Sequence, residues 1–181
     1  ASGLLDGCLI KPVNPTSLLA AICKTEGLEP PRRAVVKQSI TEDATLLDPI
    51  RGAHLLVVED NEYNQQVARE LLEAEGFDVW VAANGYKAVA MTLEQPFHLV
   101  LMDIHMPGMD GFEATSRILS SMEAPPPVVA MTAHAMAGDR EKSLEAGMKD
   151  HVTKPLDPEE LFAALLRWIP PLSPEQRQQK P

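Results

Sequence analysis

The sequence predicts an α/β fold in which five parallel strands form one sheet with helices on both of its faces. Two observations carry this prediction. Strand and helix patterns alternate five times between His54 and Ile169. Several of the strand patterns are unbroken apolar runs, such as residues 55–58, which are typical of strands buried on both faces of a parallel sheet. Regular alternation favours right-handed crossovers. A mixed α+β sheet built from the same elements is the alternative.

The five predicted strands differ in a way that indicates their places in the sheet. The first, third and fourth are almost entirely apolar, so we expect them at its centre. The second alternates between apolar and polar residues, so it should lie nearer an edge. In chain order, the expected strands are 54–59, 77–82, 98–103, 127–132 and 150–154.

The helices between these strands are predicted from their ends. Asn61 can cap the first helix, whose apolar positions Val67, Leu71 and Ala74 fall on one face, and Gly76 can end it. Asp157 caps the last helix, with proline and glutamate in its first turn. The remaining helices are expected after Asn84-Gly85, over Phe112–Ser120 and up to Gly147.

The start of the chain repeats part of its end. Residues 11–21 (KPVNPTSLLAA) match residues 154–164 (KPLDPEELFAA), and the lysine and both prolines are identical. Repetition at this separation indicates duplicated domains, although two unrelated strand–Lys-Pro–helix units would give the same pattern. The expected division is 1–24 for the last strand and helix of a preceding domain, 25–51 for a linker, 52–170 for a complete domain and 171–181 for a polar tail.

Composition and charge argue against several classes of function. The net charge of −10 disfavours a surface for nucleic-acid phosphates, so we expect no nucleic-acid partner. The apolar runs are too short to span a membrane, and the start has no signal-peptide pattern. We therefore expect no membrane contact by this segment and a cytoplasmic location, although a longer parent protein could be anchored in the inner membrane. The chain has no nucleotide-binding glycine loop, so it should not use ATP itself.

Charged and hydroxyl side chains follow four of the predicted strands. Glu59 ends the first and Asp60 follows it, Asp103 ends the third, Thr132 ends the fourth and Lys154 ends the fifth. The carboxyl ends of parallel strands meet at one edge of the sheet, so these groups should gather there. Carboxylates are the ligands that Mg²⁺ prefers, and a carboxylate beside such a metal can attack phosphorus. A lysine and a hydroxyl suit the phosphoryl oxygens. A single aspartate after a strand is more often a turn residue or a helix cap, so the joint arrangement carries the prediction.

Together these residues resemble the receiver domain of two-component signalling. The motifs that carry the resemblance are Glu59-Asp60, Asp103 followed by Met106-Pro107-Gly108-Met109-Asp110-Gly111, Met131-Thr132-Ala133, and Lys154-Pro155. The resemblance implies a flavodoxin-like sheet with strand order 2-1-3-4-5. It also implies that Asp103 accepts a phosphoryl group from a phosphohistidine. Asp60, Asp103 and the main-chain carbonyl of His105 would hold Mg²⁺, with Glu59 assisting.

The resemblance further implies a conformational switch. Thr132 and Lys154 would engage the phosphoryl group and draw in the loop that begins at Ala133. Receivers commonly carry a tyrosine or phenylalanine three residues before the lysine, where this chain has His151 and the partial first copy has Cys8. A histidine ring could still swing, with a charge that depends on pH. The alternative is a half-exposed histidine that fills a strand position.

Two further histidines are placed by spacing near the predicted site. His105 lies two residues after Asp103, and His134 lies two residues after Thr132. Loops after neighbouring strands should bring both rings to the rim of the phosphoryl pocket. We hypothesise that they shape the access of hydrolytic water and so set the lifetime of the acyl phosphate. The alternative is that they have no kinetic effect.

The resemblance implies a phosphorelay receiver, the second of two in a hybrid sensor histidine kinase. Its partners would be a phosphohistidine-bearing kinase or a phosphotransfer domain, and it could contact other receivers. The segment is not a kinase, yet it would catalyse its own phosphorylation and dephosphorylation. One alternative is a receiver used only for docking, although the acidic pair, the aspartate and the lysine are all retained. Another is a haloacid dehalogenase-like phosphatase, which needs a second carboxylate where His105 stands.

Overall fold

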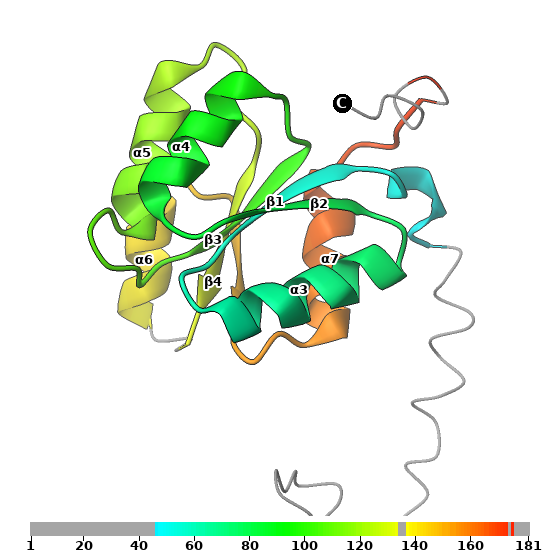
Figure 1. The fold of residues 1–181 in the computed structure, drawn as a ribbon, viewed down its shortest axis with the longest axis horizontal. Helices are drawn as coiled ribbons and strands as arrows, with labels where there is room; N and C mark the ends of the chain where they lie inside the picture. Colours follow the sequence, from blue (N-terminus) through cyan, green and yellow to red (C-terminus); the bar gives the residue numbers. More distant parts are fainter. Residues whose placement is uncertain (1–45, 134–136, 174, 176–181) are drawn as a thin grey trace, which may run out of the picture. The chain divides into compact units, whose positions relative to one another are not determined.

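One parallel sheet organises the domain in a computed structural model that describes residues 46–133, 137–173 and 175 (Figure 1). Its strand order is β2-β1-β3-β4-β5, and every neighbouring pair is parallel. The α/β fold and the order 2-1-3-4-5 are therefore confirmed, as are the central places of β1, β3 and β4 and the edge place of β2. The strands are β1 (His54–Val58), β2 (Asp78–Ala82), β3 (Leu99–Asp103), β4 (Val128–Thr132) and β5 (Asp150–Thr153).

Helices cover both faces of this sheet. Figure 1 shows α3 and α7 on one face and α4, α5 and α6 on the other. Four of the helices, α3, α4, α5 and α7, begin at an asparagine or aspartate whose side chain accepts main-chain hydrogen bonds, such as Asn61 before α3 and Asp157 before α7. The helices are α3 (Glu62–Ala74), α4 (Gly85–Glu94), α5 (Gly111–Ser121), α6 (Ala137–Glu145) and α7 (Pro158–Trp168).

The buried face of α3 differs from the one expected. Ala68 and Leu72 are the buried residues of this helix, whereas Val67 and Ala74 are exposed. Both sets recur at helical spacing and lie side by side on the helix surface. Packing against the sheet selects between the two stripes, so the apolar pattern alone could not decide which one is buried.

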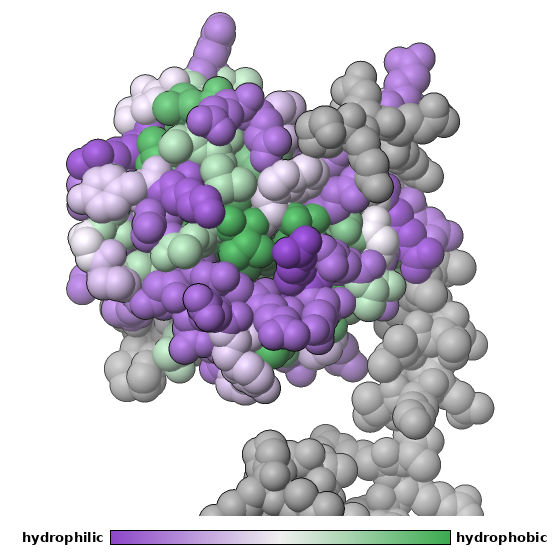
Figure 2. Space-filling view, in the orientation of Figure 1, coloured by the Kyte–Doolittle hydropathy of each residue, from purple (hydrophilic) through white to green (hydrophobic). Residues whose placement is uncertain are grey.

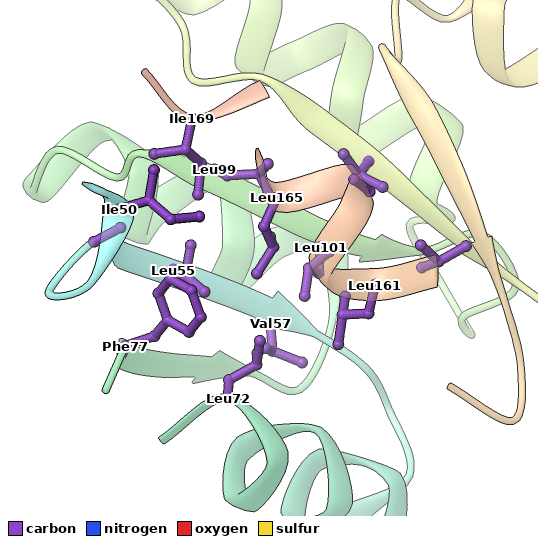
Figure 3. Close-up of a cluster of buried hydrophobic side chains, with 14 of the residues drawn as sticks. Ile50, Leu55, Val57, Leu72, Phe77, Leu99, Leu101, Leu161, Leu165 and Ile169 are labelled. Atoms are coloured by element: carbon purple, nitrogen blue, oxygen red, sulfur yellow. The ribbon is translucent and has the colours of Figure 1, made fainter. Parts of the chain in front are cut away.

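The core has two layers because the central strands are buried on both faces. Leu55 and Val57 point into the cluster between the sheet and helices α3 and α7, whereas Leu56 and Val58 belong to the cluster on the other side. Figure 3 shows the first layer, with Leu161 of α7 packed over the strands. Burying one such leucine or valine side chain stabilises the fold by about 1.5–3 kcal/mol. This two-sided burial explains the unbroken apolar runs.

Segments from the beginning and the end of the domain lie side by side, at the end of the sheet opposite its carboxyl edge. Leu47 and Ile50, in and beside the 3-10 helix η1 (Asp48–Ile50), are buried in the first core layer together with Leu172. The amide of Leu172 donates to the carbonyl of Pro49 at 2.8 Å. The folded unit therefore includes residues from the predicted linker and from the predicted tail. The predicted partial domain 1–24 and the rest of the linker up to residue 45 lie outside the described residues.

The edge strand β2 leaves an apolar strip on the surface. Val79, Trp80 and Val81 are half-buried, and Figure 2 shows a narrow apolar strip where β2 runs, between more hydrophilic surfaces.

None of the helices described here is long and apolar enough to cross a membrane.

Candidate functional site

Three carboxylates converge at the carboxyl edge of the sheet, as the sequence predicts. Glu59 and Asp60 follow β1, and Asp103 is the last residue of the neighbouring strand β3. One carboxylate oxygen from each of the three lies within 4.8 Å of the others. Glu59 and Asp103 are only 2% and 5% exposed, whereas Asp60 is open to solvent. The cluster therefore has a buried floor and one accessible carboxylate.

Lys154, which follows the edge strand β5, bridges the two buried carboxylates at the same edge of the sheet. Its Nζ lies 2.7 Å from Asp103 Oδ2 and 2.5 Å from Glu59 Oε2. The amide of Lys154 also donates to the carbonyl of Thr132 at 2.7 Å, which ties the lysine segment to the end of β4. Thr132 is itself buried at that strand end. The predicted lysine, threonine and acidic residues thus come together at one place.

The electrostatics of the site follow from burial and from these ion pairs. Burial raises the pKa of Asp103, and the charge of Glu59 adds to this effect, while the hydrogen bond and charge of Lys154 oppose it; the net direction is upward. Burial alone would lower the pKa of Lys154, but the hydrogen bonds to Asp103 and Glu59 and the negative charges of those two carboxylates together outweigh burial and hold that pKa above its usual value. Lys154 is therefore a permanent positive charge beside Asp103.

The donor set of the cluster fits a divalent cation. Three carboxylates face one ammonium, so two negative charges lack a cationic partner within the cluster. Mg²⁺ prefers such hard oxygen ligands, and its double charge would balance this excess. Asp60, the exposed member, is the carboxylate of the cluster that an ion can reach from solvent.

The main chain around Asp103 is held by short contacts. The amide of His105 donates to Asp103 Oδ1 at 3.1 Å, while the His105 side chain is exposed. The amide of Gly111 donates to the carbonyl of Ile104 at 3.0 Å. A Cβ atom on Gly111 would lie 2.2 Å from the Asp103 carbonyl oxygen and 2.9 Å from Ile104 Cα. Only glycine allows α5 to begin directly against the backbone of the aspartate.

Of the other residues predicted around the site, the structure describes His151 and Ala133. His151 is half-buried on β5 and lines a small cleft with Ser143 and Leu144 of α6, so it lies beside that helix rather than in the acidic cluster. Ala133 is exposed directly after β4. His134 lies outside the described residues.

Sequence reasoning missed the contribution of Asn64, Gln65 and Gly111. Asn64 Nδ2 donates to Glu59 Oε1 at 2.8 Å, and Gln65 Nε2 donates to the Glu59 carbonyl at 2.7 Å. An amide pair five residues after an acidic pair was the available signal. For Gly111, the signal was a glycine directly after a capping aspartate, Asp110.

A sheet of this strand order, with an acidic cluster and a lysine at its carboxyl edge, defines a receiver-type domain. The sequence profile of the response regulator receiver domain matches residues 55–166. The chain belongs to this family. Its sequence has the aspartate, the acidic pair and the lysine of the family's motifs, whereas His151 stands where receivers commonly carry a tyrosine or phenylalanine.

Its curated relatives include sensor histidine kinases. The chain is 38% identical over 167 residues to the signal transduction histidine-protein kinase BarA of Escherichia coli. The aligned region covers 92% of this chain and 17% of that protein. It is 40% identical over 122 residues to the sensor protein GacS of Pseudomonas syringae, which covers 65% of this chain and 14% of that protein. The chain thus spans less than a fifth of the length of these relatives.

Solved receiver structures share the fold. The receiver domain of the sensor histidine kinase PA1611 from Pseudomonas aeruginosa, with a magnesium ion coordinated in its active-site cleft, is 40% identical, with a TM-score of 0.60, covering 65% of this chain and 97% of that one. The receiver domain of the Saccharomyces cerevisiae response regulator Ssk1, crystallised with the histidine phosphotransfer protein Ypd1, is 31% identical, with a TM-score of 0.60, covering 64% of this chain and 88% of that one.

The close approach of Gly111 yields a prediction. In Gly111→Ala the added methyl group meets backbone atoms that cannot rotate away, so we expect a loss of about 2–3 kcal/mol in the free energy of unfolding. Urea unfolding measures this loss, and Ser121→Ala at the exposed end of the same helix is the control. A Gly111→Ala variant as stable as the wild type would contradict the packing described here.

Proposed function

We propose that Asp103 is the phosphoryl acceptor of this receiver domain and that a phosphohistidine is the donor. The observation that carries the proposal is the buried carboxylate of Asp103, 2.7 Å from Lys154 Nζ and within the acidic cluster. In the transfer, a carboxylate oxygen of Asp103 attacks the phosphorus. The bond between phosphorus and the imidazole nitrogen breaks, and the electron pair stays on that nitrogen. The product is an acyl phosphate on Asp103.

Asp60, Asp103 and the main-chain carbonyl of His105 would hold Mg²⁺, with Glu59 assisting. When bound, the ion would neutralise the repulsion between the attacking carboxylate and the phosphoryl oxygens. The chain's own contribution is to keep the carboxylates together despite their like charges. Lys154 does so by pairing with both buried members of the cluster.

Lys154 and Thr132 would stabilise the phosphorylated state. Lys154 is already in contact with Asp103, so a small movement of its ammonium group suffices to reach a phosphoryl oxygen. Thr132 stands at the end of β4 and could donate its hydroxyl to another oxygen. Ala133, exposed directly after it, would move with the threonine. His151 would take part in this switch only through β5 and its contact with α6.

The partner surface proposed here lies beside the acidic cluster. A cleft of about 420 Å³ is lined by Tyr63 and Val67 of α3 and by Leu156 after β5, together with Glu59 and Lys154. Tyr63 and Val67 are exposed, at 74% and 41%. This cleft would offer an apolar surface next to Asp103, against which a helix that bears the phosphohistidine could pack. The Ypd1–Ssk1 complex, which pairs a histidine phosphotransfer protein with a related receiver, supports a donor of this kind.

The wider context of the proposal is a hybrid sensor histidine kinase. BarA, a signal transduction histidine-protein kinase, and GacS, a sensor protein, resemble this chain over a small part of their length. We propose that the domain passes phosphoryl groups within such a protein, on the cytoplasmic side of a parent anchored in the inner membrane, and that it can contact a neighbouring receiver. The partial repeat in residues 1–24 supports a tandem arrangement.

Phosphorylation by a small donor tests the proposed function. Incubation of the chain with acetyl phosphate and Mg²⁺ should add the mass of one phosphoryl group, as measured by intact-mass spectrometry. Asp103→Asn should take up none, because its amide is not a nucleophile, and removal of Mg²⁺ with a chelator should suppress the reaction in the wild type. Asp110→Asn, which alters an exposed helix cap, is the matched control and should be phosphorylated. A wild-type chain that gains no mass would favour a domain used only for docking.

The lifetime of the acyl phosphate tests the hypothesis about the rim histidines. Replacing His105 and His134 together by alanine should change the rate at which phosphate is lost, because His105 is exposed beside Asp103 and the sequence places His134 at the same rim. The rate is measured after removal of the donor. An unchanged rate would end the hypothesis.

A further inference from the structure

Two amide side chains in the first turn of α3 hold Glu59. Asn64 Nδ2 donates to Glu59 Oε1 at 2.8 Å, and Gln65 Nε2 donates to the main-chain carbonyl of Glu59 at 2.7 Å. The second carboxylate oxygen, Oε2, pairs with Lys154 at 2.5 Å. Both oxygens of this buried carboxylate are therefore fixed, one from α3 and the other from the segment after β5.

The start of α3 makes this arrangement rigid. Asn61 Oδ1 accepts hydrogen bonds from the amides of Tyr63 and Asn64, at 3.0 and 3.2 Å. The cap therefore fixes the main chain of Asn64 in the first turn of the helix, and the Asn64 side chain reaches back to Glu59. The hydrogen bond between the Asn64 and Glu59 side chains thus closes the loop formed by residues 59–64.

We propose that Asn64 is a positioning residue of the metal site, which keeps the Glu59 carboxylate turned toward Asp60 and Asp103. This inference rests on the proposed function of the cluster as a Mg²⁺ site. With Lys154 as its single partner, the Glu59 carboxylate could pivot about that one contact. The second hydrogen bond removes this freedom, so the three carboxylates stay within 4.8 Å of one another before the ion arrives. Groups that orient the ligands of a metal commonly change its affinity by 10–100-fold when they are removed.

Isothermal titration of Mg²⁺ into the 181-residue chain tests this proposal. We expect Asn64→Ala to bind Mg²⁺ about 10-fold more weakly than the wild type, and Asn64→Gln, which retains an amide donor, to recover part of the affinity. Gln66→Ala is the matched control, since Gln66 is exposed on the same helix and its side chain donates to Glu70, away from the acidic cluster. Urea unfolding of each variant separates a change in metal affinity from a change in stability. If Asn64→Ala does not fold, Asn64→Leu, of similar volume and without a donor, takes its place.

The outcomes separate this proposal from the proposed function. An affinity of Asn64→Ala within about twofold of the wild type would overturn the role of Asn64, as would equal losses in the alanine and glutamine variants. A wild-type chain that binds Mg²⁺ but takes up no phosphoryl group would contradict the proposed function. The comparison of affinities needs no phosphorylation, so it would still decide the role of Asn64.

Discussion

Two buried carboxylates and one ammonium group share a small volume at the carboxyl edge of the sheet, and the rest of the domain is arranged to keep them there. Burial of a single unpaired charge costs several kcal/mol, and Lys154 offsets this cost by pairing with both Glu59 and Asp103. These three residues come from segments that are far apart in the chain. They meet only when β1, β3, β4 and β5 stand in the observed order.

The fold keeps this charged site because the layers on either side of it are apolar and closely packed. The central strands are buried on both faces, so their ends cannot shift without disrupting two core layers at once. Gly111 brings α5 against the backbone of Asp103, and the Asn61 cap fixes the start of α3 beside Glu59. Strand ends and helix starts thus fix the site more closely than loops of ordinary length would.

The sequence was informative where a residue's chemistry and its place on a strand pointed the same way. Asp103, Thr132 and Lys154 each stand at the end of a predicted strand, and the parallel sheet brings them together as expected. Apolar spacing was less informative on α3, where two adjacent stripes have the same helical period. Packing against the sheet buries Ala68 and Leu72.

Other features depend on distances that sequence does not contain. The hydrogen bond from Asn64 to Glu59 needs the turn angle between β1 and α3, and the tight contact at Gly111 needs the position of α5 over β3. The burial of Leu47, Ile50 and Leu172 could not be predicted from the sequence. These residues lie in segments with the pattern of a linker or a tail, and such a pattern does not show which of its apolar residues pack into a core.

The proposed function requires that phosphorus becomes bonded to the carboxylate of Asp103 and to no other. Borohydride reduces an aspartyl phosphate to homoserine, so reduction of the phosphorylated chain followed by peptide mass spectrometry locates the acceptor. The structure predicts homoserine at position 103 alone, because Asp103 is the carboxylate that both faces Lys154 and ends a central strand. Modification at Asp60 instead, or a phosphorylated chain in which position 103 remains aspartate, would contradict the account.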